Sequence, residues 1–91
     1  MNVIEMVSTF MPTDGSGPRT ITIRISGLRE ETDGLWSVAV DVTGFRTDDH
    51  VRLKGPDWLS ALESATGFIR RLAGGKVRDY GGTIVPPLLP P

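Results

Sequence analysis

The sequence predicts an α+β fold in which an antiparallel meander of three or four strands carries one helix on one face. Two patterns lead to this prediction. Apolar and polar residues alternate through residues 20–26 and 35–42, as in strands that are half buried in a sheet. From residue 58 to residue 73 the apolar spacing changes to steps of three and four, which is typical of an amphipathic helix.

The strands are expected in chain order, separated by turns. Residues 3–10 form the first strand, and the Pro-, Asp-, Gly- and Ser-rich residues 11–18 form the turn after it. Residues 20–26 form the second strand, which we expect Gly27 to end, and Asp33-Gly34 turns the chain into a third strand over 35–42. Residues 50–54 form a short fourth strand at a sheet edge, where its Lys and Arg discourage further pairing.

Local sequence signals predict where the helix begins and where it ends. Asp57 is placed to cap the free amides there, and Gly74-Gly75 is expected to end the helix. We expect Trp36 and Trp58 in the core between sheet and helix. Gly67 is attributed to close packing of the helix on the sheet. Residues 77–80 are expected as a brief extended piece, before Gly81-Gly82 turns the chain.

Length and composition predict one domain over residues 1–85 and a proline-rich tail over 86–91. Either the tail leucines pack on the domain, or Pro86-Pro87-Leu88-Leu89-Pro90 binds an aromatic groove of a partner. Hydrophobic residues make up 38% of the chain and the mean hydropathy is −0.07, which predicts a folded, soluble protein. No signal sequence or membrane span is evident, so the expected location is cytoplasmic.

Few residues could carry out catalysis. The chain has no cysteine and one histidine, which excludes a disulfide scaffold, a thiolate metal site and a cysteine nucleophile. Asp48-Asp49-His50 is the one cluster that unites carboxylates with the imidazole, and a metal there would need a further ligand such as Asp41 or Asp14. We interpret the cluster as a polar turn. The sequence therefore predicts no enzyme, no metal site and no cofactor.

The start of the predicted helix carries a family resemblance. Gly55-Pro56-Asp57, followed by Trp58–Leu62 and Ile69–Leu72, resembles small uncharacterised bacterial domains of unknown function that open with β-strands and close with such a helix. A similar helix occurs in small immunity proteins that neutralise bacterial toxins. The resemblance covers roughly the last two-thirds of the chain, and departs from the family at Ser60 and in the proline-rich end. It implies protein binding and no catalytic residues.

The charge distribution suggests two binding hypotheses. Residues 1–49 hold eight acidic and four basic side chains, whereas residues 50–91 hold three acidic and six basic ones. The leading hypothesis is a non-enzymatic protein-binding module, an immunity or inhibitor protein that occludes a basic partner protein through acidic side chains. These are Glu30, Glu31, Asp33, Asp48 and Asp49.

The alternative hypothesis is a small nucleic-acid-binding regulator with a basic patch after the helix. Its residues are Arg70, Arg71, Lys76, Arg78 and Tyr80. Because the first strand is apolar on both faces, we also expect the tail or another chain to cover it, which leaves room for a homodimer.

Overall fold

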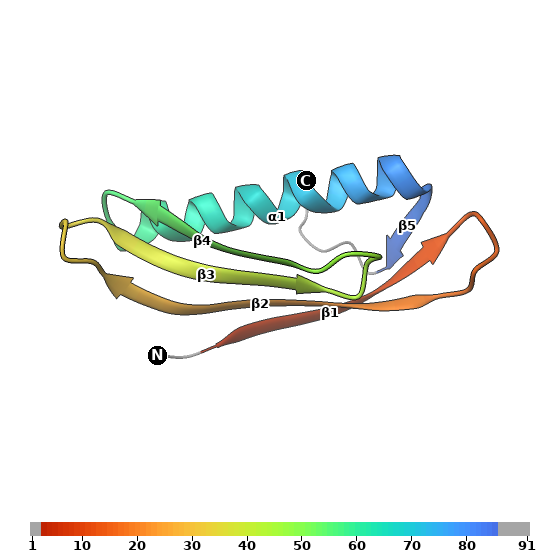
Figure 1. The fold of residues 1–91 in the computed structure, drawn as a ribbon, viewed down its shortest axis with the longest axis horizontal. Helices are drawn as coiled ribbons and strands as arrows, with labels where there is room; N and C mark the ends of the chain where they lie inside the picture. The colour runs from red at the N-terminus through yellow and green to blue at the C-terminus, as the bar shows by residue number, and fades with distance from the viewer. Residues whose placement is uncertain (1–2, 86–91) are drawn as a thin grey trace.

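The computed structural model describes residues 3–85, and in it one helix lies across one face of a five-stranded antiparallel sheet (Figure 1). The predicted α+β class is confirmed, and the sheet has five strands where three or four were predicted. In chain order the elements are β1 (Ile4–Pro12), β2 (Arg19–Glu30), β3 (Trp36–Thr43), β4 (Asp49–Gly55), α1 (Trp58–Tyr80) and β5 (Gly82–Val85). The strand order across the sheet is β4-β3-β2-β1-β5, so β4 is an edge strand as predicted.

The core lies between α1 and the alternating residues of the central strands. The register places Ile23 opposite Val42 and Ile25 opposite Val40, so these side chains share one face of the sheet. On the helix, Ala61, Ala65 and Ile69 are buried against this face. The remaining buried apolar side chains are Phe10, Ile21, Val38 and Phe45.

The helix begins as predicted but ends later. Asp57 Oδ1 accepts a hydrogen bond from the Ser60 amide at 2.7 Å, which confirms the predicted cap. The predicted end at Gly74-Gly75 is wrong, and so is the extended piece over 77–80, because α1 continues to Tyr80. Val77 and Tyr80 pack against the core, and this packing outweighs the cost of about 1 kcal/mol for each helical glycine. Gly81, with φ of +70°, then ends the helix.

Gly67 does not serve the close packing expected of it. A Cβ atom built there would meet only Arg71 Nη1, at 3.3 Å, and no atom of the sheet. The tight approach between sheet and helix occurs at Gly55 instead, where a Cβ atom would lie 2.6 Å from the Ala61 nitrogen.

Strand β2 runs through Gly27, so the prediction that this residue ends the strand is wrong. The register between β2 and β3 shifts between Ser26 and Arg29, as in a β-bulge, and Gly27 has φ of +64°. Arg52 Nη1 donates to the Gly27 carbonyl at 3.0 Å and to Ser37 Oγ at 2.7 Å. The bulge is thus stabilised by an arginine from β4, two strands away.

The fifth strand, β5, pairs with the second half of β1, from Thr9 opposite Val85 to Pro12 opposite Gly82. It was missed because its four residues are too few to show an alternating pattern. The predicted tail over 86–91 lies outside the described residues. Over residues 3–85, we find no helix with the length and apolar character that a membrane span requires.

Candidate protein-binding surface

The five acidic residues predicted to bind a partner lie at two opposite ends of β3. Glu30 is the last residue of β2, and Glu31 and Asp33 lie in the turn that follows it, whereas Asp48 and Asp49 lie where β4 begins. Eight residues of β3 separate the two groups, roughly 26 Å at about 3.3 Å per residue. The five residues therefore do not form one surface. The predicted third strand, residues 35–42, already lies between the two groups in the sequence, so its length indicates the same separation.

The acids between β2 and β3 are held in place by their neighbours. Glu31 accepts hydrogen bonds from the Ser37 hydroxyl and from Arg29 Nε, and these lower the pKa of Glu31. Asp33 accepts from the Leu35 amide at 3.0 Å and from Lys54 Nζ at 3.1 Å, which lowers the pKa of Asp33. Both carboxylates are consequently ionised at neutral pH. Glu30 is exposed at the same end.

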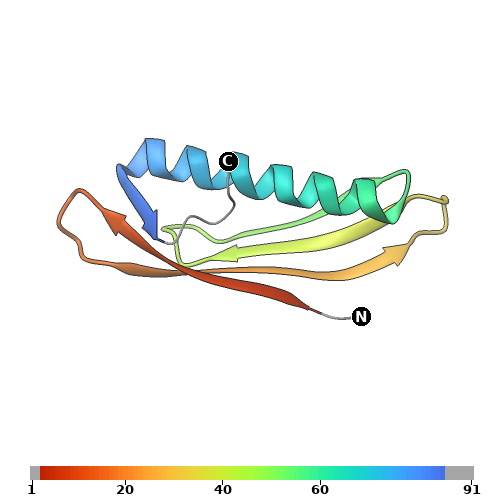
Figure 2. The same ribbon diagram turned by 180° about the vertical axis from the view of Figure 1, so that it is seen from behind.

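Large apolar side chains are exposed at the same end of the molecule as these three acids. Trp58 and Leu59 are each 51% exposed, and Leu35 is 37% exposed. The register places Trp36 opposite Gly55, which brings Leu35 near the segment that leads into α1. Figures 1 and 2 show the turn between β2 and β3 and the start of α1 at the same end of the molecule. We call this set the acidic–aromatic end: Glu30, Glu31, Asp33, Leu35, Trp58 and Leu59.

Trp58 is the site residue that sequence reasoning misplaced. It follows the apolar stripe of the helix and was therefore predicted in the core, but the buried helix positions start one turn later, at Ala61. Trp36 does pack against the core, as predicted. The position of Trp58 as the first helical residue was the available signal, because the first turn of a helix often extends beyond the sheet that it covers.

Asp48 and Asp49 serve the fold at the other end. Asp48 Oδ1 accepts from the Gly44 amide at 3.4 Å. Asp49 Oδ2 lies 3.6 Å from Lys76 Nζ, and the Lys76 side chain is only 12% exposed. Both acids are therefore engaged with the loop before β4 or with the helix, rather than grouped with the acidic–aromatic end.

The residues of the predicted basic patch do not form one free surface either. Arg70, Arg71 and Arg78 are exposed on α1. Lys76 turns inward, donates to Thr47 Oγ1 at 2.9 Å and lies 5.5 Å from the Tyr80 ring centre. Tyr80 in turn lies beneath the Arg46 guanidinium, 5.0 Å from its ring centre. Two of the five predicted nucleic-acid contacts are thus occupied within the chain.

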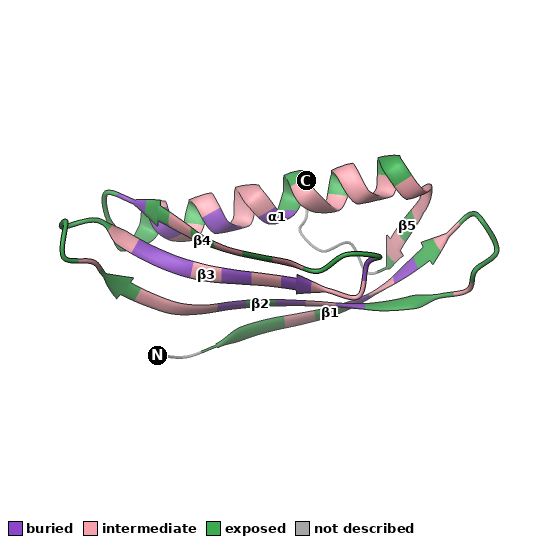
Figure 3. Ribbon diagram, viewed as in Figure 1, coloured by how far each residue is buried: buried purple, intermediate pink, exposed green. Residues whose placement is uncertain are grey.

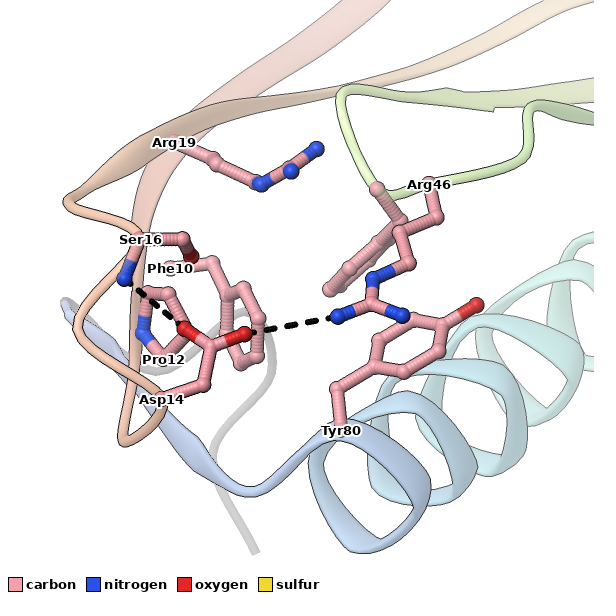
Figure 4. Close-up of a pocket in the computed structure, with 8 residues that line it drawn as sticks. Phe10, Pro12, Asp14, Ser16, Arg19, Arg46 and Tyr80 are labelled. Atoms are coloured by element: carbon pink, nitrogen blue, oxygen red, sulfur yellow. Dashed lines mark hydrogen bonds and ion pairs between the residues drawn. The ribbon is translucent and has the colours of Figure 1, made fainter.

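A small pocket lies at the end of the molecule opposite the acidic–aromatic end, and Figure 4 shows the residues that line it. Arg46 Nη2 lies 3.3 Å from Asp14 Oδ2, and the Ser16 amide donates to Asp14 Oδ1 at 2.9 Å. The hydrogen bonds from Ser16 lower the pKa of Asp14. The free volume is about 10 Å³, enough for about one water molecule. These contacts tie the turn after β1, the loop before β4 and the end of α1 together, so the pocket is structural.

Asp49 and His50, neighbours in the segment interpreted as a polar turn, do not converge. His50 lies opposite Asp41 and Asp49 opposite Val42, so their side chains point to different faces of the sheet. His50 Nδ1 is 2.7 Å from Asp41 Oδ1, and this hydrogen bond raises the pKa of His50. Over residues 3–85, no three His, Asp or Glu side chains are grouped so that they could hold a metal ion.

No protein family, curated protein or solved structure matches this chain. The resemblance noted at the start of the helix therefore stays a prediction.

Proposed function

We propose that the protein is a non-enzymatic protein-binding module that occludes a basic partner with its acidic–aromatic end, in the manner of an immunity or inhibitor protein. The observation that carries the proposal is the half-exposed pair of Trp58 and Leu59 at the same end of the molecule as three carboxylates. Tryptophan is enriched among the few residues that dominate binding energy in protein interfaces. A charged rim around such an apolar centre adds specificity and association rate.

The acidic rim needs little reorganisation before it binds. Glu31 and Asp33 already have fixed positions through Ser37, Arg29, the Leu35 amide and Lys54. Binding a partner would therefore cost less side-chain entropy than it would for mobile acids. Lys54 already donates a hydrogen bond to Asp33. A cationic group of the partner must therefore contact Glu30, or it must share the Asp33 carboxylate with Lys54.

The nucleic-acid alternative rests on the three exposed arginines of α1. It has less support because Lys76 and Tyr80 contact their own chain. Titration of a labelled oligonucleotide at two salt concentrations tests it, since phosphate contacts weaken steeply with salt. Binding that is salt-dependent and is lost when Arg70, Arg71 and Arg78 are replaced by glutamine would favour the alternative.

The protein-binding proposal is tested with paired baits in extracts of the native host. Wild-type protein, Trp58→Ala and the control Val85→Ala are immobilised in parallel; Val85 is 57% exposed but lies on the distant strand β5. A stoichiometric partner should be retained by the wild type and by the control. Its affinity for Trp58→Ala, measured by calorimetry once the partner is purified, should fall about 30-fold, as for a strong hot-spot residue.

Circular dichroism of each bait shows whether the variant is folded. The proposal is contradicted if no stoichiometric partner is recovered, or if the partner binds wild type and Trp58→Ala equally well. Leu59→Lys provides a second variant of the same surface and should weaken binding in the same direction.

A further inference from the structure

Two acids of the acidic–aromatic end each carry a cation of their own chain. Lys54 Nζ lies 3.1 Å from Asp33 Oδ2, and Arg29 Nε lies 3.0 Å from Glu31 Oε1. A basic partner that binds this end therefore meets two carboxylates that are already paired. The two pairs differ in how closely they belong to the fold.

The pair of Glu31 and Arg29 is part of the fold. The Glu31 side chain is 22% exposed, and the hydroxyl of the fully buried Ser37 donates to the same Glu31 oxygen as Arg29 does. Ser37 in turn accepts from Arg52 at 2.7 Å, so Glu31 completes a network that reaches strand β4. Taking this carboxylate over would disturb a hydrogen bond to a buried hydroxyl, which is costly.

The pair of Asp33 and Lys54 is open to solvent. Their side chains are 48% and 50% exposed, and Figure 3 shows the turn between β2 and β3 largely exposed. Asp33 does not need Lys54 to hold its place, because its other oxygen, Oδ1, accepts from the Leu35 amide at 3.0 Å. This amide is the first cause that lowers the pKa of Asp33 and Lys54 the second, so the carboxylate stays ionised without the lysine. Lys54 therefore neutralises Asp33 more than it positions it.

We propose, on the basis of the proposed function, that Lys54 is an internal competitor for the Asp33 carboxylate and that an arginine of the partner displaces it from Oδ2. A planar guanidinium can donate to both oxygens of one carboxylate, whereas the Lys54 ammonium donates to Oδ2 alone. Exposed ion pairs stabilise a fold little, so the exchange costs the protein little stability. Lys54 thereby raises the affinity that a partner's cation needs, and arginine meets this requirement better than lysine.

Competition and positioning predict opposite results when Lys54 is removed. If Lys54 competes, Lys54→Met frees Asp33 Oδ2 and a cationic ligand binds more tightly. If Lys54 instead positions Asp33, the same variant binds the ligand more weakly. Methionine suits this test because it is unbranched and uncharged, so it keeps much of the apolar stem of lysine.

The probes are hexa-arginine and hexa-lysine peptides, titrated into isotope-labelled protein in about 0.15 M salt. The chemical shift of the Leu35 amide reports on Asp33, because this amide donates to the carboxylate. We expect the wild type to bind hexa-arginine at least about 2-fold more tightly than hexa-lysine. Lys54→Met should bind both peptides about 2- to 5-fold more tightly than the wild type, with their ratio unchanged, since Lys54 competes equally with both.

Two controls separate competition at Asp33 from a general change of charge. Arg70→Met removes one positive charge from an exposed site on α1, about 18 Å along the helix from Trp58, and should leave both affinities unchanged because salt screens charges at that distance. In an Asp33→Asn background, Lys54→Met should have no effect. The proposal is overturned if Lys54→Met binds the peptides no more tightly than the wild type, or if Arg70→Met tightens binding as much.

The proposed function is judged by a separate result. A partner whose binding depends on Trp58, once purified, should also bind Lys54→Met about 2- to 5-fold more tightly than the wild type. If such a partner binds Lys54→Met and the wild type equally, the proposed function stands and Lys54 is not a competitor. If the peptides reveal the competition but no partner in host extracts depends on Trp58, the competition stands and the proposed function fails.

Discussion

The glycine at position 74 allows a direct test of where the helix ends. Gly74 lies within α1, has a negative φ, and a Cβ atom added there would meet no atom within 4 Å. Alanine fits this backbone without strain and loses less conformational entropy on folding. We therefore expect Gly74→Ala to raise the free energy of unfolding by about 0.5 to 1 kcal/mol. For a chain of this length that corresponds to a rise in Tm of roughly 2 to 8 °C.

The assay is urea unfolding followed by tryptophan fluorescence and circular dichroism, with thermal unfolding as a check. Gly44→Ala is the matched control because Gly44 has φ of +107°, and a Cβ atom there would lie 2.0 Å from the Thr20 carbonyl oxygen. That variant should lose about 2 kcal/mol or more. If Gly74→Ala is neutral or destabilising, the helix does not run continuously through residue 74, and the account of its last two turns fails.

Two further predictions concern single polar groups. Asp57→Ala should lower the urea midpoint by removing the cap on the Ser60 amide, whereas Asp57→Ser should largely retain it; equal midpoints for Asp57→Ala and wild type would contradict the capping role. The pKa of His50 is raised by Asp41, so its contribution to stability is present below about pH 6.5 and is lost as the pH rises through the folded-state pKa. The unfolding free energy between pH 5.5 and 8.5 should therefore decline with pH in the wild type and decline less in Asp41→Asn, and parallel curves would refute the coupling.

Much of the fold could be predicted from local patterns. The isoleucines of β2 and the valines of β3 alternate cleanly, and the register places them on one buried face. Tertiary packing decided the features that were missed. Val77 and Tyr80 hold the last turns of α1 despite two glycines, and β5 exists only because β1 is available to pair with it.

The binding surface was less predictable because composition does not show which acids share an end. Asp33 and Asp48 belong to the same acidic half of the sequence, but β3 holds them apart. The exposed state of Trp58 depends on where the sheet ends beneath the helix, which periodicity alone does not give. The resulting surface keeps three of the predicted acids and adds apolar residues that the sequence had assigned to the core or had not singled out.

The pairing of β5 with β1 has a consequence for how the molecule opens. The strands from β1 to β4 are joined to their neighbours by short turns, so their pairing needs only local loop closure. β5 pairs with the first strand of the chain, so its pairing closes a longer loop than any other pair of described strands, and four described residue pairs join it to β1. Partial opening should therefore start at β5. Its release would leave the outer edge of β1 over Thr9–Pro12 without its partner strand, and mild destabilisation would thereby expose a template for aggregation.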